Sequence, residues 1–250
     1  MVAIATSVVA LVVVVAVVTA SIVHKTNVVR ESEKGVMSAG LVSLDPSLYD
    51  KIGKGQAQYV AEDTGNPIGG SGQASLLYVG AEFCPYCAME RLSLTAALSR
   101  FGKFDGLSDS VSSSREKDMA SIPTVTYRNS TYSSKYVRFS PVELQDSDGN
   151  KISDLTSEQR KVFQKYDPKG YIPFLYWGDS VTEIPAQIQS LSNKTSSDAM
   201  GLIKNPDTDE SKKVIGGANL MSAEICKRNG GRPASVCTSK GVRDADSLLR

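Results

Sequence analysis

The sequence predicts an α/β domain with a mixed sheet flanked by helices, behind an N-terminal apolar segment and before a C-terminal helical extension. Short apolar runs alternate along the chain with stretches of helical periodicity. The composition is that of a globular protein, with 250 residues, 41% hydrophobic and 22% charged. An uncharged apolar run covers residues 2–23. We therefore expect four parts: a transmembrane anchor or signal segment at 1–23, a stalk and N-terminal extension at 24–73, the α/β domain at 74–193 and the C-terminal extension at 194–250.

Residues 2–23 have the length and composition of a membrane-spanning helix. As a helix the run is about 33 Å long at about 1.5 Å per residue, enough to cross a hydrocarbon core of about 30 Å. A buried core helix of this length would normally show a polar face, and this run shows almost none. The favoured interpretation is a single-pass anchor in the cell membrane. The alternatives are a buried segment or a cleaved signal peptide with Val18-Thr19-Ala20 as its cleavage site, although the usual basic region is missing.

Two features disagree about the side of the membrane on which the domain lies. Lys25, Arg30 and Lys34 follow the apolar run and no basic residue precedes it, which by the positive-inside rule places the domain in the cytoplasm. Cys226 and Cys237 flank a short stretch with Gly and Pro, a spacing that suits a structural disulfide, with a redox-active pair as the alternative. Structural disulfides persist mostly in oxidising compartments. We favour this second argument and expect an extracytoplasmic domain.

The part of the chain before the α/β domain is expected to hold a stalk, one short helix and a loop. The stalk runs from His24 to about Gly40, because this segment is mixed and polar. The helix covers residues 46–52, with Asp45 as its N-cap and Pro46 at the first helical position. Closely spaced Gly and Pro residues predict the loop at 64–72.

The α/β domain is expected to begin with an apolar strand that leads directly into a helix. Pro85 suits the first turn of this helix, where its missing N–H is not needed. Further on, Thr156 to Gln159 has the form of a capping box and starts a second helix, which ends near Tyr166. The expected elements are strands at 76–79, 124–127, 136–139, 174–177 and 181–184, helices at 85–100, 156–166 and 218–228, a turn at 129–134, a serine-rich surface loop at 103–121, an irregular region at 193–213 and a loosely ordered tail after Lys240.

Cys84 and Cys87 are the candidate functional residues. A C-x-x-C pair at a strand-to-helix junction suits reversible dithiol–disulfide chemistry. Cys84 lies at the helix N-terminus, where unpaired N–H groups and the helix dipole favour a thiolate, so we expect it to be the attacking sulfur. Cys87 lies one turn further on and is expected to resolve a mixed disulfide.

The charge and histidine content exclude several other functions. The single histidine, His24, leaves no Ser-His or Cys-His catalytic pair and no His-rich metal site. The net charge of +1 gives no indication of a nucleic-acid partner. We therefore expect neither a metal nor another cofactor.

Two stretches carry a family resemblance. Ala81-Glu82-Phe83-Cys84-Pro85-Tyr86-Cys87-Ala88-Met89 resembles the active-site segment of thioredoxins, and Pro85-Tyr86 between the cysteines is typical of glutaredoxins. Gly170-Tyr171-Ile172-Pro173-Phe174-Leu175 resembles the cis-proline strand of the thioredoxin fold, with Ile122-Pro123 as a rival match. The resemblance implies a thioredoxin-like mixed sheet with an insertion between its halves, and a substrate groove formed by Pro85, Tyr86, Ile172 and Pro173.

The layout from about residue 41 to 240 resembles a membrane-anchored prokaryotic family, domain of unknown function 929. One position departs from the thioredoxin pattern, because Tyr78 stands six residues before Cys84, where thioredoxins usually carry a buried acid. The resemblance therefore leaves open which group accepts the proton of the second thiol. Glu82 and Glu90 are the candidates for proton transfer, although the favoured interpretation of both is a solvated surface charge.

The cysteine pair and the resemblance predict a membrane-tethered thiol–disulfide oxidoreductase. It would act on protein or small-molecule thiols outside the cytoplasm, with thiol-containing proteins and a further redox protein as partners. One alternative is a thioredoxin-fold binding or structural module whose cysteines only cross-link the fold. The other is a module that handles Cu(I) or Zn(II), because paired thiolates also suit these ions.

Overall fold

The computed structural model describes residues 33–66, 72–183 and 188–249. The chain divides into two units, Met1–Lys34 and Gly35–Arg250, and the account below concerns the second. The apolar run at 2–23, with the expected anchor, lies outside the described residues. Among the residues that are described, no helix combines the length and the apolar character needed to cross a membrane.

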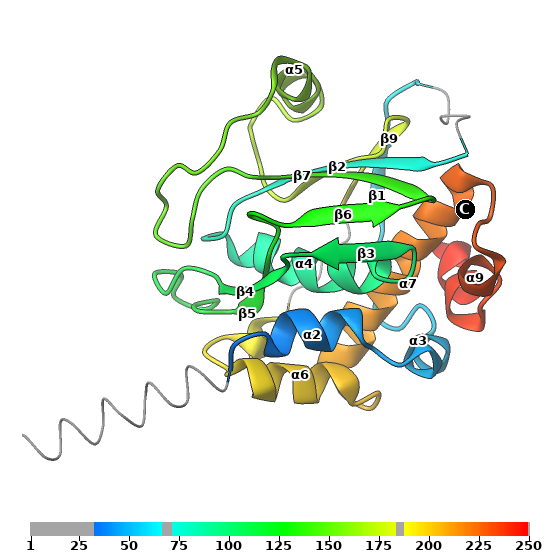
Figure 1. The fold of residues 1–250 in the computed structure, drawn as a ribbon, viewed down its shortest axis with the longest axis horizontal. Helices are drawn as coiled ribbons and strands as arrows, with labels where there is room; N and C mark the ends of the chain where they lie inside the picture. The colour runs from blue at the N-terminus through cyan, green and yellow to red at the C-terminus, as the bar shows by residue number, and fades with distance from the viewer. Residues whose placement is uncertain (1–32, 67–71, 184–187, 250) are drawn as a thin grey trace, which may run out of the picture. The chain divides into compact units, whose positions relative to one another are not determined.

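A five-stranded mixed sheet forms the centre of the second unit, in the order β1–β9–β8–β2–β7 (Figure 1). β2 (Ala74–Gly80) and β7 (Val137–Glu143) are parallel neighbours. β8 (Phe174–Tyr176) is antiparallel to β2, β9 (Ser180–Glu183) is antiparallel to β8, and β1 (Val60–Asp63) is antiparallel to β9. The predicted α/β class with a mixed sheet is therefore confirmed.

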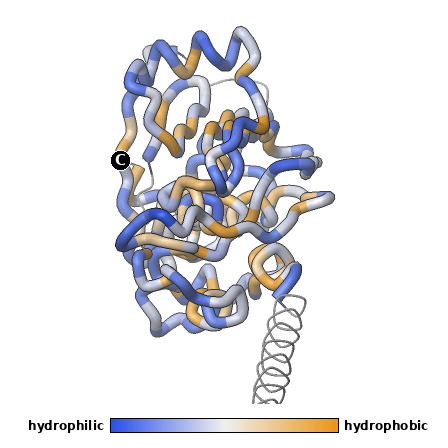
Figure 2. Tube along the Cα trace, turned by 90° about the vertical axis from the view of Figure 1, so that its left-hand side faces the viewer, coloured by the Kyte–Doolittle hydropathy of each residue, from blue (hydrophilic) through white to orange (hydrophobic). Residues whose placement is uncertain are grey.

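Helices flank this sheet, as the sequence predicts. α4 (Pro85–Leu98) and α7 (Asp209–Asn229) pack together below the sheet in Figure 1, and α5 (Ser157–Tyr166) lies above it. α5 is mostly hydrophilic along its length (Figure 2), and Phe163 is its buried residue. Its capping box forms as predicted, with the Thr156 side chain accepting from the Gln159 N–H at 3.2 Å.

β2 separates two apolar clusters. Leu76 and Tyr78 belong to the main core with residues of α4 and α7, whereas Leu77 and Val79 pack in a smaller cluster with Phe163. Alternate side chains of a strand point to opposite faces, so both faces of β2 are covered. A strand buried on both faces has a continuous apolar sequence, and this explains why β2 could be predicted.

Two small sheets lie outside the central one. β3 (Gly102–Asp105) pairs with β6 (Thr131–Ser134), and β4 (Ser108–Val111) pairs with β5 (Pro123–Thr126). The expected surface loop at 103–121 is therefore wrong over β3 and β4, and the expected turn at 129–134 contains β6.

The small strands depend on tertiary contacts rather than on their own sequence pattern. β3, β4 and β6 are short and partly exposed, and β4 and β6 contain two Ser each, whereas β5 is buried and overlaps the expected strand at 124–127. The Phe104 ring lies 4.8 Å from that of Tyr132 and 5.9 Å from that of Tyr127. Such aromatic contacts hold the strands in place although the local sequence resembles a loop.

α2 (Val36–Val42) corrects the expected stalk. Met37 and Leu41 are fully buried in the main core, so the stalk cannot extend to Gly40. The carboxylate of Asp109 in β4 accepts hydrogen bonds from the N–H groups of Met37 and Ser38, at 3.0 and 2.8 Å. A distant strand therefore caps this helix, which a local reading of the sequence does not reveal.

α3 (Pro46–Ile52) forms as predicted. The Asp45 carboxylate accepts from the N–H of Ser47 at 2.8 Å, and Pro46 occupies the first turn.

The C-terminal region contains more helix than its sequence predicts. α6 (Ser196–Lys204) lies within the region expected to be irregular, and α7 begins at Asp209 rather than near residue 218. Thr195 and Thr208 cap these helices, each with a hydroxyl that accepts from a backbone N–H three residues on. The expected loose tail contains α9. The remaining elements are α8 (Ala234–Cys237), α9 (Lys240–Asp246) and the short 3₁₀ helices at Gln189–Leu191 and Ser247–Leu249.

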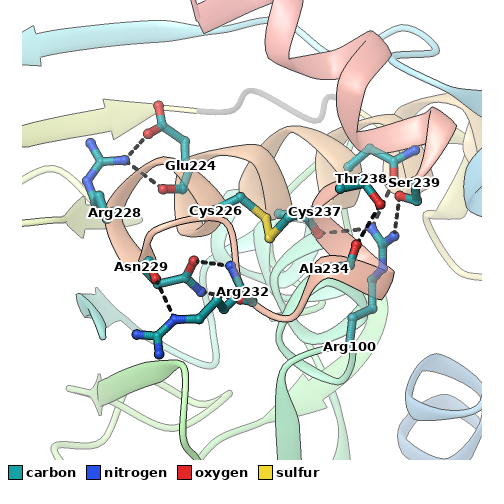
Figure 3. Close-up of a disulfide and its surroundings, with 12 residues drawn as sticks. Arg100, Glu224, Cys226, Arg228, Asn229, Arg232, Ala234, Cys237, Thr238 and Ser239 are labelled. Carbon is teal, nitrogen blue, oxygen red and sulfur yellow. Dashed lines mark hydrogen bonds and ion pairs between the residues drawn. A yellow bond between two sulfur atoms is a disulfide. The ribbon is translucent and has the colours of Figure 1, made fainter. Parts of the chain in front are cut away.

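A disulfide joins Cys226 of α7 to Cys237 of α8 (Figure 3). It is the pairing that the sequence predicts, and the two Cα atoms are 5.6 Å apart. Beside it Arg228 pairs with Glu224 of the same helix and, at 2.6 Å, with Asp179 between β8 and β9. The ion pair with Asp179 connects the C-terminal extension to the central sheet.

Candidate functional site

Cys84 lies at the point where β2 ends and α4 begins. It is the N-cap of α4, and its Sγ accepts a hydrogen bond from the N–H of Cys87 at 3.3 Å. Pro85 follows at the first helical position, where proline is well tolerated. The positive end of the helix dipole therefore faces the Cys84 sulfur, which favours the thiolate form.

The two thiols have different environments. Both are free, and Cys84 is 5% exposed whereas Cys87 is fully buried. The pKa of Cys84 is lowered, first by its interaction with the Cys87 thiol and then by the Cys87 N–H and the charge of Arg91, with burial opposing. Burial raises the pKa of Cys87, and its interaction with Cys84 adds to this. Cys84 is thus the more readily ionised thiol.

The loop before β8 lies against the Cys84 sulfur. The Ile172–Pro173 peptide bond is cis, and the carbonyl oxygen of Ile172 lies 3.7 Å from the Sγ of Cys84. Ile172 also packs against the small cluster formed by Ala81 and the two thiols. Ile122–Pro123, the rival match, is not among the cis bonds of the described residues.

Two exposed tyrosines flank this arrangement in the sequence. Tyr86, between the cysteines, is 47% exposed, and Tyr171, before Ile172, is 67% exposed. A hollow of about 180 Å³ lies beside the loop, and Tyr171, Pro173 and Phe174 contribute to its lining. Two exposed aromatic side chains therefore lie close in the sequence to the buried Cys84 and to the loop that contacts it.

Glu82 and Glu90 are not the solvated surface charges that the sequence favours. Glu82 is 7% exposed and accepts a hydrogen bond from the Thr126 hydroxyl at 2.6 Å. Glu90 is 3% exposed, and its Oε1 has no hydrogen-bond partner. Burial raises the pKa of Glu90 to about 8, and the nearby charge of Glu183 acts in the same direction. Tertiary packing buries both carboxyl groups, which the sequence pattern does not show.

A buried ion pair that the sequence analysis missed lies close to the thiols. Arg91 of α4 is fully buried, and its Nη1 lies 3.1 Å from an oxygen of Glu143. The same Nη1 donates to the Tyr78 hydroxyl at 3.1 Å and to the Ala81 carbonyl at 3.2 Å. Burial raises the pKa of Glu143, although the charge of Arg91 opposes this.

The sequence carries a signal for the position of Arg91, but its pairing with Glu143 follows only from the strand register. Arg91 follows Cys87 by four residues, so both side chains lie on the same face of the helix. Glu143 is at the carboxyl end of β7, directly opposite Gly80 at the end of β2. Charged residues at these positions are unusual in a core and indicate a specific role.

The described residues offer little to a metal ion. They contain no group of three or more His, Cys, Asp or Glu side chains that could hold one. Two thiolates form an incomplete tetrahedral set. Cys226 and Cys237, which the metal alternative would add, are joined in their disulfide.

The fold and the site define an α/β protein with a paired-cysteine site at a helix N-terminus. Residues 64–177 match the sequence model of the family described as Domain of unknown function (DUF929). The match confirms the resemblance to this family, and its range includes both thiols and the loop at Pro173. No curated protein and no solved structure matches the chain.

Proposed function

We propose that the protein is a thioredoxin-like thiol–disulfide oxidoreductase. The observation that carries this proposal is the position of the Cys84 sulfur at the N-terminus of α4, 3.7 Å from the carbonyl oxygen of Ile172. A reactive thiol needs a stabilised thiolate and access to a substrate. The helix terminus supplies the first, and the aromatic surface at Tyr86 and Tyr171 is suited to the second.

The sheet topology supports the thioredoxin-like assignment. β2 and β7 are parallel, β8 and β9 follow antiparallel, and the spatial order is β9–β8–β2–β7. The paired cysteines begin the helix after the first of these strands, and the cis-proline precedes the third. The small sheets lie in the segment between α4 and β7, which is where the family resemblance implies an insertion.

The exchange reaction balances with these two thiols and one substrate disulfide. The Cys84 thiolate attacks one substrate sulfur, a mixed disulfide forms, and the other substrate sulfur leaves as a thiolate. That thiolate takes the proton of Cys87. Cys87 then attacks the Sγ of Cys84, and the remaining substrate thiolate leaves. Two electrons have passed from the dithiol to the substrate, and the reverse sequence oxidises a substrate dithiol.

The proposed location is the outer side of the cell membrane. Residues 2–23 form the uncharged apolar run that would anchor the chain. The Cys226–Cys237 disulfide favours an oxidising compartment. The partners would be thiol-containing proteins and a second redox protein that returns the pair to its starting state.

Replacing each cysteine of the pair tests this function. Cys84→Ser should abolish insulin reduction and the oxidative refolding of a reduced substrate protein. Cys87→Ser should instead accumulate mixed disulfides with the substrate, because nothing resolves them. Cys226→Ser/Cys237→Ser is the matched control and should retain exchange. If wild-type protein and Cys84→Ser are equally inactive in both assays, the proposal fails.

The low exposure of the thiols favours one alternative. A pair with Cys84 only 5% exposed and Cys87 fully buried also suits a structural or binding module. In that case, disulfide reagents should modify Cys84 no faster than the protein unfolds. Rapid reaction of the folded protein would exclude the structural alternative.

A further inference from the structure

Tyr78 departs from the thioredoxin pattern, so another group must favour ionisation of the second thiol, Cys87. The position six residues before Cys84 carries a phenol where an acid is usual in that fold. The phenol is fully buried, and burial raises its pKa well above the ordinary value. Tyr78 is therefore neutral and cannot act as a carboxylate does. The Tyr78 hydroxyl accepts a hydrogen bond from Arg91, which is an ionised side chain.

We propose that the buried guanidinium of Arg91 stabilises the thiolate of Cys87 by its charge, and so favours loss of the Cys87 proton to the leaving substrate thiolate at a site that lacks the usual acid. Arg91 is a positioning residue in this proposal, since it acts through the charge on the sulfur and touches no substrate. The inference rests on the proposed exchange function, because it concerns the resolving thiol of that same site.

Geometry places the guanidinium beside the thiols. Arg91 follows Cys87 by one helical turn, on the same face of α4. Ala81 packs against both cysteines, and its carbonyl accepts a hydrogen bond from Arg91. The charge of Arg91 acts to lower the pKa of both thiols, although burial keeps the pKa of Cys87 raised. One buried cation therefore interacts with both ends of the redox pair.

The hydrogen bonds of Arg91 leave two of its three nitrogens without an acceptor. Nη1 makes all the contacts, to Tyr78, Ala81 and Glu143. Nε and Nη2 are buried without a hydrogen-bond partner. A buried N–H group without an acceptor is costly, and a thiolate formed on Cys87 would reduce this cost by attracting the guanidinium.

Glu143 sets the orientation of the guanidinium and opposes its effect. Its carboxylate binds Arg91 through both oxygens, at 3.2 and 3.1 Å. Each negative charge near the thiols works against thiolate formation. Five other titratable groups surround this site. Tyr78 lies in β2, Glu82 and Cys84 lie between β2 and α4, Glu90 lies in α4, and Tyr127 follows β5.

Two substitutions of opposite sign test the proposal. Arg91→Gln removes the cation and should raise the pKa of Cys87 by about 1 unit, an approximately tenfold loss of thiolate below that pKa. Glu143→Gln keeps a hydrogen-bond acceptor but removes the opposing charge, so the pKa of Cys87 should fall. The measurement is the carbon-13 chemical shift of each cysteine Cβ against pH in the reduced full-length protein.

Two further variants separate electrostatics from structural damage. Arg91→Lys retains the charge and should keep the Cys87 pKa closer to that of wild type than Arg91→Gln does. Arg100→Gln is the matched control. Arg100 follows α4 and binds Asn219 and Ser222, roughly 20 Å from Cys87 at about 1.5 Å per residue. It should leave both thiol pKa values unchanged.

The outcomes are distinguishable from a failure of the proposed function. Unchanged thiol pKa values in Arg91→Gln, or a shift of the same sign in Arg91→Gln and Glu143→Gln, would overturn the inference, even if Cys84→Ser still abolishes exchange. If Arg91→Gln does not fold, the Glu143→Gln variant tests the inference alone. A Cys87 pKa that is unchanged or raised in Glu143→Gln would then overturn the inference. The titration needs no substrate, so it remains informative if exchange is absent.

Discussion

At the scale of single residues, the two thiols of one motif differ in ways that suit different tasks. Cys84 caps α4 and has a lowered pKa, whereas burial raises the pKa of Cys87. A thiol that ionises readily is the better attacking group near neutral pH. A thiol that stays protonated and buried is protected until a mixed disulfide brings its partner sulfur within reach.

The buried carboxyl of Glu90 makes stability depend on pH. Its pKa is raised from 4.5 to about 8, so between these values the folded protein holds a proton that the unfolded chain has released. Stability should therefore fall as the pH rises through this window. Glu90→Gln removes the titration and should be more stable than wild type by roughly 1–3 kcal/mol at about pH 8, with a smaller difference at about pH 5.

Urea unfolding of both proteins across this range measures the effect. If the curves of stability against pH run parallel for wild type and Glu90→Gln, Glu90 does not titrate as described.

Local sequence was enough to find the thiols but not the buried charges near them. The strand–C-x-x-C–helix pattern locates Cys84 and Cys87, and a downstream Ile-Pro pair locates Pro173. Arg91 and Glu143 meet only because β2 and β7 are parallel neighbours, and no local pattern encodes this pairing. Burial of a carboxyl likewise depends on what packs over it, and this is why the favoured interpretation of Glu82 and Glu90 was wrong.

At the scale of elements, the predictable segments are those that carry their own signals. α3 and α5 have caps within their own sequence, and β2 contains the unbroken apolar run from Leu76 to Val79. α2 and β4 were missed because they stabilise each other across the chain. The Asp109 carboxylate supplies the cap that Gly35, at the N-terminus of α2, cannot.

Asp109 should therefore contribute to stability although it lies on a partly exposed strand. Asp109→Ala removes the acceptor of two backbone N–H groups in α2 and should cost about 1–2 kcal/mol, the usual range for a lost N-cap. Asp105→Ala, at an exposed position in β3, is the matched control. Urea denaturation measures both, and an equal, small effect in the two variants would show that the cap is unimportant.

At the scale of the whole unit, the C-terminal extension is part of the core. α7 packs along α4, the helix that carries both thiols, and the Arg228–Asp179 ion pair connects it to the sheet. The sequence predicted a shorter helix, because the first turns of α7 are largely polar and Gly216 and Gly217 interrupt the helical pattern.

The Cys226–Cys237 disulfide should stabilise this extension without taking part in exchange. It closes a loop of 11 residues, which corresponds to about 3 kcal/mol in the chain-entropy account. Cys226→Ser/Cys237→Ser should lose about that much stability in urea and keep the exchange rate of wild type under native conditions. Loss of exchange in a variant that is still folded would show that this pair is redox-active.

The most direct test of the central claim is the mass of the folded Cys87→Ser protein after reaction with oxidised glutathione. A nucleophilic Cys84 should give one glutathione adduct, mapped to Cys84 by peptide analysis, and Cys84→Ser should give none under the same conditions. The adduct should form faster than on a free cysteine at slightly acidic pH, because the backbone N–H of residue 87 and the charge of Arg91, which both lower the pKa of Cys84, remain in this variant. If Cys84 stays unmodified while the protein is folded, it is not the attacking thiol of an oxidoreductase.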